Sequence, residues 1–276
     1  MTPVCGRFVS STPVEDLAQY FGVTDTPDEL IELESERSEP NFNTAPTTDV
    51  LAVFEADGAR HLDLFRWGLI PRWAKDRSVG NRMINARAET LATKNAFKPA
   101  FKRRRCIVPV DGFYEWTALP GAKKRQPWFV HRVDGEPFAF AGLWETWKPP
   151  AAGHDEQPEP SAGQSGSVIH SVTIITGRPN ELLVHIHDRM PVMLAASEWD
   201  RWLDPTNEDI ETLQSLFVPA PAEMMAMHPV SAEVNNARNS GAQLVDAVTI
   251  MDPDGAGTGL PVPDFDAGET IPGTRG

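Results

Sequence analysis

The stretch Cys106-Ile107-Val108-Pro109-Val110-Asp111-Gly112-Phe113-Tyr114-Glu115-Trp116 decides the fold class. Its two halves are rich in β-branched and aromatic residues, which favour strands, and Asp-Gly separates them. We therefore expect one strand before Asp111-Gly112 and another after it. Runs of the same kind recur on both sides of this stretch and also predict strands, at residues 50–55, 61–67, 128–133, 138–144 and 168–176.

Helix signals are scattered between these strands at irregular spacing. Thr12 and Pro13 read as an N-cap and a first helical residue, and Gly22 reads as the stop of that helix. Further helical patterns cover residues 88–95, 99–104, 180–185, 198–203 (capped by Ser197) and 209–217. Strands along the whole chain with interspersed helices predict a single α+β domain around a mainly antiparallel sheet.

Two segments fall outside this pattern. Residues 149–167 contain Pro, Gly, Ala, Ser, Gln and acids, and the end of the chain from Asp252 onward has the same character. Such compositions bury too little apolar surface to fold. We predict a flexible acidic insertion at 149–167 and a disordered acidic tail at 252–276, which leaves residues 5–251 as the domain.

Composition also bounds the cellular setting. The two cysteines, Cys5 and Cys106, lie far apart, which suits a reducing compartment and offers no disulfide framework. No stretch approaches the ~20 apolar residues of a membrane span, and the N-terminus lacks the layout of a secretory signal. We expect a cytoplasmic protein without a membrane partner, with a monomer as the default state.

The charge distribution favours a nucleic-acid partner although the chain has a net charge of −14. Residues 60–132 contain 17 Lys and Arg against five Asp and Glu, a local charge of +12. The acidic residues concentrate at 25–40, 151–166 and 252–276. This pattern is typical of a phosphate-binding face on an otherwise acidic protein, although a merely solvated surface would also explain Lys102–Arg105.

Cys5 is the residue with the most informative chemistry. If Cys5 is the first residue, it carries a thiol and an α-amine with a pKa of ~7.7–8.0. The amine can condense with an aldehyde to an imine, and the thiol can then close a thiazolidine ring on the same carbon. This chemistry requires removal of residues 1–4, which we predict to be a leader absent from the mature protein. A buried, unreactive cysteine is the ordinary alternative, and Cys106 reads as such a residue.

Three further residues have side chains suited to proton transfer or orientation. Glu115 stands between aromatic residues, where a carboxyl tends to have a raised pKa. His187 can act as acid or base near pH 7, and we expect Asp188 to pair with an arginine. Asn85, Arg87 and Glu89 alternate and would point the same way if extended. His185 and His187 lack a clear third ligand, so we predict no metal and no cofactor.

Cations and aromatic residues near these positions suggest how single-stranded DNA would bind. Arginines hold phosphates, and tryptophans stack on unpaired bases. Asn43 is a turn residue on local grounds and joins this group only through the wider pattern. The predicted DNA-binding residues are Arg7, Asn43, Trp67, Arg87, Trp116 and Arg189.

Taken together, the motifs resemble the SRAP family, the SOS-response-associated peptidase-like, abasic-site processing proteins. The resemblance runs from Cys5 to about Val245 with the motifs in order. Those motifs begin at Cys5 (Cys-Gly-Arg-Phe), Asn43 (Asn-x-Ala-Pro), Trp67 (Trp-Gly-Leu-Ile-Pro-x-Trp), Asn85 (Asn-Ala-Arg-Ala-Glu-Thr), Asp111 (Asp-Gly-Phe-Tyr-Glu-Trp), His187 (His-Asp-Arg-Met-Pro) and Val234 (Val-Asn-Asn-Ala-Arg).

The resemblance implies a single α+β domain with a barrel-like sheet, peripheral helices and a basic groove. It also implies a DNA-damage function, in which the N-terminal cysteine forms a thiazolidine crosslink with an abasic site in single-stranded DNA. By motif match the catalytic residues would be Cys5, Asn85, Glu115 and His187. Self-removal of the residues before the cysteine and strand-cleaving lyase activity are further implied possibilities.

The start of the chain departs from the family pattern, because family members usually begin Met-Cys. Translation starting at a GUG codon for Val4 would explain the difference, and a self-cleaved leader is the alternative. Two rival functions remain open. One is a cysteine peptidase or amidase using Cys5 and His187; the other is a noncatalytic single-strand-binding module with a structural Cys5.

Overall fold

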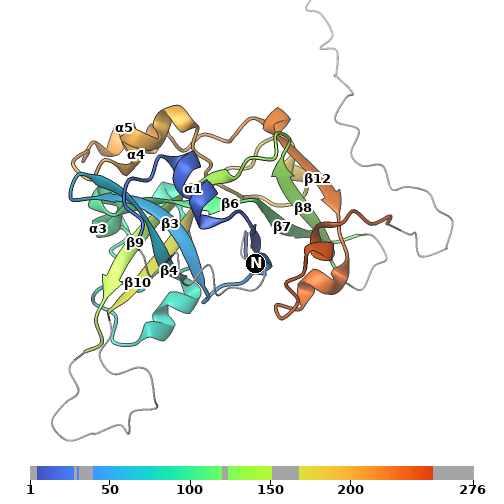
Figure 1. The fold of residues 1–276 in the computed structure, drawn as a ribbon, viewed down its shortest axis with the longest axis horizontal. Helices are drawn as coiled ribbons and strands as arrows, with labels where there is room; N and C mark the ends of the chain where they lie inside the picture. Colours follow the sequence, from blue (N-terminus) through green and yellow to red (C-terminus); the bar gives the residue numbers. More distant parts are fainter. Residues whose placement is uncertain (1–4, 28–29, 31–39, 120–123, 151–167, 251–276) are drawn as a thin grey trace, which may run out of the picture.

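A computed structural model describes residues 5–27, 30, 40–119, 124–150 and 168–250 of the 276-residue chain. The predicted leader, the predicted tail and residues 151–167 of the predicted insertion lie outside these ranges. Two β-sheets form the body of the molecule (Figure 1). The first sheet has the order β12-β8-β7-β1-β2. Its strands are β1 (Phe8–Ser10), β2 (Asn41–Thr44), β7 (Gly112–Thr117), β8 (Gln126–Arg132) and β12 (Met225–Pro229).

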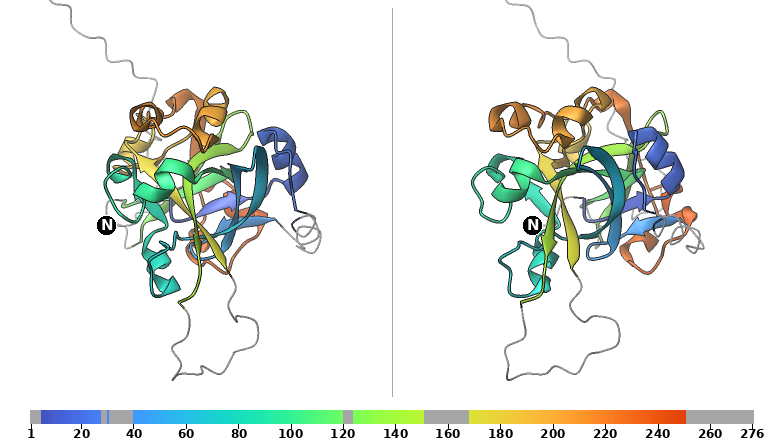
Figure 2. Two further views of the ribbon diagram at one scale, coloured as in Figure 1. Left: turned by 90° about the vertical axis from the view of Figure 1, so that its left-hand side faces the viewer. Right: turned by 60° about the vertical axis from the view of Figure 1, so that its left-hand side comes forward.

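The second sheet closes on itself into a barrel. Strand β10 pairs in parallel with β4 along one edge and antiparallel with β9 along the other, so β10, β4, β3, β6 and β9 form a ring (Figure 2). The short strands β5 and β11 add to β10 beyond this ring. The strands are β3 (Asp49–Ala56), β4 (Ala59–Trp67), β5 (Asn85–Arg87), β6 (Arg105–Val110), β9 (Phe138–Trp147), β10 (Ile169–Gly177) and β11 (Met190–Pro191). The predicted α+β fold with a mainly antiparallel, barrel-like sheet and peripheral helices is confirmed.

Alternation along the strands divides the core between the two faces of this barrel. On β3, Leu51 and Val53 pack with the helices outside the barrel, whereas Val50 and Ala52 face inward. The inward cluster includes Cys5, Phe8 and Phe113, and so joins the barrel to the first sheet. The helices are α1 (Val14–Phe21), α3 (Lys98–Arg103), α4 (Trp199–Leu203) and α5 (Ile210–Ser215).

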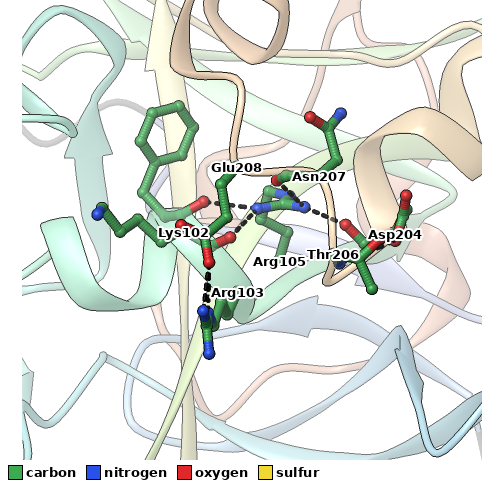
Figure 3. A network of polar contacts seen from close by, with 8 residues as sticks. Lys102, Arg103, Arg105, Asp204, Thr206, Asn207 and Glu208 are labelled. Carbon is green, nitrogen blue, oxygen red and sulfur yellow. Dashed lines mark hydrogen bonds and ion pairs between the residues drawn. The ribbon is translucent and has the colours of Figure 1, made fainter.

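Arg105, at the start of β6, ties α3 and the turn after α4 to the barrel. Arg105 is 2% exposed, and its guanidinium donates hydrogen bonds to backbone carbonyls of both segments (Figure 3). Burial lowers the pKa of Arg105 to about 10. A planar cation with five donors can hold several carbonyls that would otherwise lack partners. The accepting carbonyls belong to Phe101, Lys102, Trp202, Asp204 and Asn207.

Several helix predictions need correction. The first helix begins after Pro13 and ends at Gly22 in the left-handed region (φ 64°), but Thr12 does not cap it. Thr12 instead donates two hydrogen bonds to Asp111. Residues 88–95 contain only a 3₁₀ turn at Ala88–Thr90, and Ser197 lies inside a 3₁₀ turn and makes no side-chain cap. Short turns such as these are held by tertiary contacts, which local propensity does not reveal.

Candidate active site and DNA-binding surface

Strand pairing brings Cys5 to Glu115. β1 runs antiparallel to β7, with Phe8 opposite Phe113, and the amide of Tyr114 donates to the carbonyl of Arg7. The residues before β1 therefore lie alongside the second half of β7. There the backbone nitrogen of Cys5 donates to Glu115 Oε1 at 2.6 Å. This is the contact between the predicted nucleophile and the predicted proton carrier.

Both residues of this pair are shielded from solvent. Cys5 is 0% exposed and Glu115 is 3% exposed. Cys5 has a φ of 45°, in the left-handed region that a residue with a side chain seldom adopts without local support. In this chain the Cys5 nitrogen is an amide; in a chain that begins at Cys5 the same atom would be the α-amine.

Burial controls the ionisation of both groups. Desolvation raises the pKa of Glu115 to about 8, and hydrogen bonds from the amides of Cys5 and Trp116 oppose that rise only partly. Desolvation, followed by the neighbouring Glu115 charge, also raises the pKa of the Cys5 thiol well above its ordinary value. The site therefore holds a carboxyl that titrates near neutral pH beside a protonated thiol.

The end of β10 brings two other motifs together. Thr176 of β10 lies between Arg87 of β5 on one edge and Pro191 of β11 on the other. The motif starting at Asn85 and the motif starting at His187 therefore meet across a single strand. The inward cluster that contains Cys5 also contains Ile84, beside Asn85, together with Leu183 and Met190, which bracket His187. Sequence neighbours of Asn85 and of His187 thus pack in the same buried cluster as Cys5.

His187 has two competing neighbours at one ring nitrogen. Its Nδ1 lies 2.9 Å from Asp188 Oδ1 and 3.1 Å from the backbone nitrogen of Arg189. When Nδ1 is unprotonated it accepts from the Arg189 amide, and when it is protonated it can donate to Asp188. The expectation that Asp188 pairs with an arginine was wrong, because this carboxylate lies against the imidazole.

Arg189 is held by the strand end that it borders. It makes a two-pronged ion pair with Glu89, with Nη1–Oε1 and Nη2–Oε2 distances of 3.2 and 3.0 Å. It also donates to the hydroxyl and the carbonyl of Thr176. Most of its donors are therefore engaged within the protein, and a phosphate would have to share or displace them. The ion pair keeps the pKa of Glu89 below its usual range despite partial burial.

Asn43 and Arg7 serve a loop of the protein itself. Asn43 is 2% exposed. Its Nδ2 donates to the carbonyls of Val234, Asn236 and Asn239, and its Oδ1 accepts from Arg7. Direct contact of Asn43 with DNA is therefore excluded in this arrangement, which corrects that prediction. Arg7 is half-buried, and its Nη1 donates to Asn43 Oδ1 and to the Val234 carbonyl.

Trp67, Trp116 and Trp73, the second tryptophan of the motif that begins at Trp67, differ in exposure. Trp67 is 0% exposed and donates its indole N–H to the Ile84 carbonyl, so the prediction that it stacks on a base was wrong. Trp116 is half-buried and donates to Asn235 Oδ1 at 2.7 Å. Trp73 is 61% exposed, beside a hollow of about 450 Å³ that Asn95 and Lys98 also line. Trp73 follows Gly68 and Pro71 and lies outside any strand. This position is the sequence signal that distinguishes it from Trp67.

The segment that carries Trp73 exposes cations. Between residues 72 and 98 seven Lys and Arg are exposed against two exposed acids, Asp76 and Glu89. These exposed cations fall within the basic stretch of the sequence, and the segment includes Arg87, which pairs with Thr176 at the end of β10. The seven cations are Arg72, Lys75, Arg77, Arg82, Arg87, Lys94 and Lys98.

Within the described ranges, no group of three or more His, Cys, Asp or Glu is arranged to hold a metal ion. None of the helices in the described ranges has the length and apolar character that a membrane span requires.

Solved structures with the same fold include a protein from Bacteroides thetaiotaomicron. It matches with a TM-score of 0.73 and 23% sequence identity, over 88% of this chain and all of that one. At this identity the likeness concerns the fold alone.

Comparisons of sequence identify the family. The abasic site processing protein YoqW of Bacillus subtilis is 38% identical over 244 residues, which is 88% of this chain and 100% of that protein. The abasic site processing protein YedK of Escherichia coli is 34% identical over 255 residues, 89% of this chain and 100% of that protein. The abasic site processing protein HMCES of Pongo abelii is 33% identical over 77% of this chain and 66% of its own length. The family model described as SOS response associated peptidase (SRAP) matches residues 4–237, and the chain belongs to this family.

Proposed function

We propose that this protein senses abasic sites in single-stranded DNA and captures them covalently through Cys5. The observation that supports this most is the 2.6 Å contact between the Cys5 nitrogen and the buried carboxyl of Glu115. The relatives named as abasic site processing proteins support the abasic site as the target. A crosslink of this kind would shield the lesion during the DNA-damage response, in the cytoplasm and on the nucleoid.

Imine formation comes first. With Cys5 as the first residue, the ammonium would transfer a proton to Glu115, and the neutral amine would attack the aldehyde carbon of the ring-opened sugar. Glu115 would then return the proton to the hydroxyl of the carbinolamine, which leaves as water. The adjacent positive charge would lower the pKa of Glu115 relative to the chain with an amide here, so the two groups share one proton.

Ring closure follows without a leaving group. The Cys5 sulfur bonds to the imine carbon, and the thiol proton moves to the ring nitrogen. A thiol that stays protonated until this step leaves the amine as the first nucleophile, which fits the raised pKa of Cys5. Transfer of a proton from the sugar carbon next to the imine carbon to the Glu115 carboxylate, with departure of the phosphate from the following carbon, would cleave the strand by β-elimination, which is the proposed lyase activity.

His187 and Asn85 prepare the sugar in this proposal. An imidazole whose Nδ1 lies within hydrogen-bond distance of both the Arg189 amide and the Asp188 carboxylate would serve proton transfer as the sugar opens to its aldehyde. Asn85 would orient the amine or a sugar hydroxyl from β5. Arg87 and the exposed cations near it would hold phosphates, with Trp73 and Trp116 against neighbouring bases.

Maturation of the N-terminus is part of the same proposal. Only a chain that starts at Cys5 has the α-amine, so the preceding residues must be removed or never translated. The Val4–Cys5 bond ends at the nitrogen that contacts Glu115, and a carboxyl with a pKa of about 8 could protonate the departing amine during self-cleavage.

The peptidase or amidase function uses the same residues but a different nucleophile. A cysteine peptidase needs a thiolate, and such sites lower the thiol pKa. Burial and Glu115 act on Cys5 in the opposite direction. We therefore rank this function below aldehyde capture for substrates other than the protein's own N-terminus.

The deciding experiment combines a denaturing gel with intact-mass spectrometry. Protein whose mass begins at Cys5 is mixed with a single strand carrying one abasic site, beside a strand with all bases. We expect a gel-stable adduct only with the abasic strand. Cys5→Ser should give an adduct that survives only after reduction with cyanoborohydride, because it forms the imine but cannot close the sulfur ring. Cys106→Ser is the matched control and should behave like wild type. No adduct from a chain that begins at Cys5 would refute covalent capture.

A further inference from the structure

The loop of residues 234–239 is built on a fixed support. The buried amide of Asn43 holds three of its carbonyls, and Arg7 holds one of them. The amide of Phe42 donates to the carbonyl of Ser240, which ties the end of the loop to β2. Since the carbonyls point toward Asn43, the side chains of Asn235, Asn236 and Arg238 remain exposed. The loop therefore presents polar side chains from a rigid backbone.

Asn235 is oriented for donation. Its Oδ1 accepts the indole N–H of Trp116, which fixes which end of the amide is the nitrogen. Among the described residues, its Nδ2 has no hydrogen-bond partner. Two N–H donors are therefore available at the surface beside Trp116.

Arg238 adds a positive charge to the same loop. Its backbone nitrogen is held by Asn236 Oδ1, whereas its side chain makes no ion pair within the described ranges. Exposed cations and amide donors are among the groups that commonly contact DNA phosphates.

The loop lies on one side of the reactive pair, and the basic segment lies on another. Trp116 follows Glu115 on β7 but packs on the opposite face of that strand, with Tyr114 and Val234, so Asn235 is joined to the first sheet one position beyond Glu115 and on its other face. Arg87 belongs to β5, at the end of β10 in the barrel. In Figure 1 the orange-to-red segment after β12 lies beside β7 and β8, apart from the cyan segment below β4 and β10 that contains Arg77–Arg82.

We propose that the loop 235–238 binds the DNA backbone on the side of the lesion opposite to that held by Arg87. Asn235 and Arg238 would contact phosphates of one flank, and Arg87 with the exposed cations near it would contact the other. The abasic sugar would then be drawn down to Cys5 between two anchored flanks. This inference rests on the proposed function for the position of the lesion.

The test uses strands with tetrahydrofuran in place of the abasic sugar, which has no aldehyde and binds reversibly. Three strands are compared by fluorescence anisotropy: one with nucleotides on both sides of the analogue, one with nucleotides only on its 5′ side, and one with nucleotides only on its 3′ side. Asn235→Asp keeps the acceptor for Trp116 and replaces the donors with a negative charge, and Arg238→Gln removes a positive charge. Arg201→Gln on α4, a half-exposed arginine paired with Glu198, is the matched control.

We expect each loop variant to weaken binding of the two-sided strand roughly fivefold, and Arg238→Gln also to lower its salt slope by about 0.7. Binding of one truncated strand should be weakened by the loop variants, and binding of the other should not. Arg87→Gln should weaken binding of the strand that the loop variants leave unaffected. Equal effects on both truncated strands, or no effect on any, would overturn the proposal. This binding result does not depend on adduct formation. If no adduct forms but the loop variants still affect only one truncated strand, covalent capture is refuted and the loop proposal stands.

Discussion

Glu115 is the residue on which the chemistry depends most directly. It is buried, it accepts a hydrogen bond from the nitrogen of Cys5, and its pKa is raised to about 8. Glu115→Gln keeps an oxygen that can accept this hydrogen bond but cannot carry a proton. We expect adduct formation at pH 7 to slow by roughly 10²–10⁴-fold, the usual range for general acid–base catalysis. Single-turnover time courses on denaturing gels measure this, and a rate within threefold of wild type would contradict the role.

The same carboxyl makes stability depend on pH. Its proton is held more tightly in the folded protein than in the unfolded chain, where a glutamate titrates near pH 4.3. Its contribution is therefore complete below about pH 4 and is lost as pH rises toward 8. In a chain that retains an amide at Cys5, wild type should lose up to about 4 kcal/mol of unfolding free energy relative to Glu115→Gln between pH 5 and pH 8. Urea unfolding of both proteins at the two pH values tests this, and parallel pH profiles would contradict it.

Sequence alone separated reactive residues from supporting ones only in part. Cys5 and Glu115 were named from their motifs, and strand pairing then placed them in contact. Trp67 and Trp73 stand in one motif, yet one is fully buried and the other mostly exposed. That difference depends on which face of β4 meets the first sheet and on where the strand ends. Neither is encoded in local propensity.

Among the secondary-structure elements, α3 and α4 depend on a single buried arginine. Arg105→Lys replaces a five-donor fork with a three-donor ammonium and leaves some carbonyls of these segments without a partner. We expect a loss of about 2–4 kcal/mol in the free energy of unfolding. Arg103→Lys, which alters an exposed pair with Glu208, should cost less than about 1 kcal/mol. Urea denaturation of the two variants gives the comparison, and equal losses would refute the bracing role of Arg105.

Strands were easier to predict than helices, for a physical reason. The runs at 50–55 and 61–67 lie within β3 and β4, because β-branched and aromatic residues mark positions that pack on both sides of a sheet. The helices are short and end where tertiary bonds intervene, as when Thr12 bonds Asp111 instead of capping α1. Long-range hydrogen bonds of that kind leave no periodic trace in a sequence.

At the scale of the whole molecule, the net charge conceals the surface that matters. The chain carries −14, yet residues 72–98 expose seven cations against two acids, next to the end of β10. A strand that neutralises cations on this face releases counterions, so log K should fall linearly with log salt by about 0.7 per phosphate contact. Arg82→Gln and Arg87→Gln together should lower the slope by about 1.4. Arg132→Gln and Arg201→Gln together remove the same charge from residues that line a cavity beside α4, and the slope should then stay unchanged. Anisotropy titrations of a tetrahydrofuran strand between 50 and 200 mM salt supply the slopes. Equal changes from the two pairs would mean that DNA responds to the overall charge of the protein and not to this face.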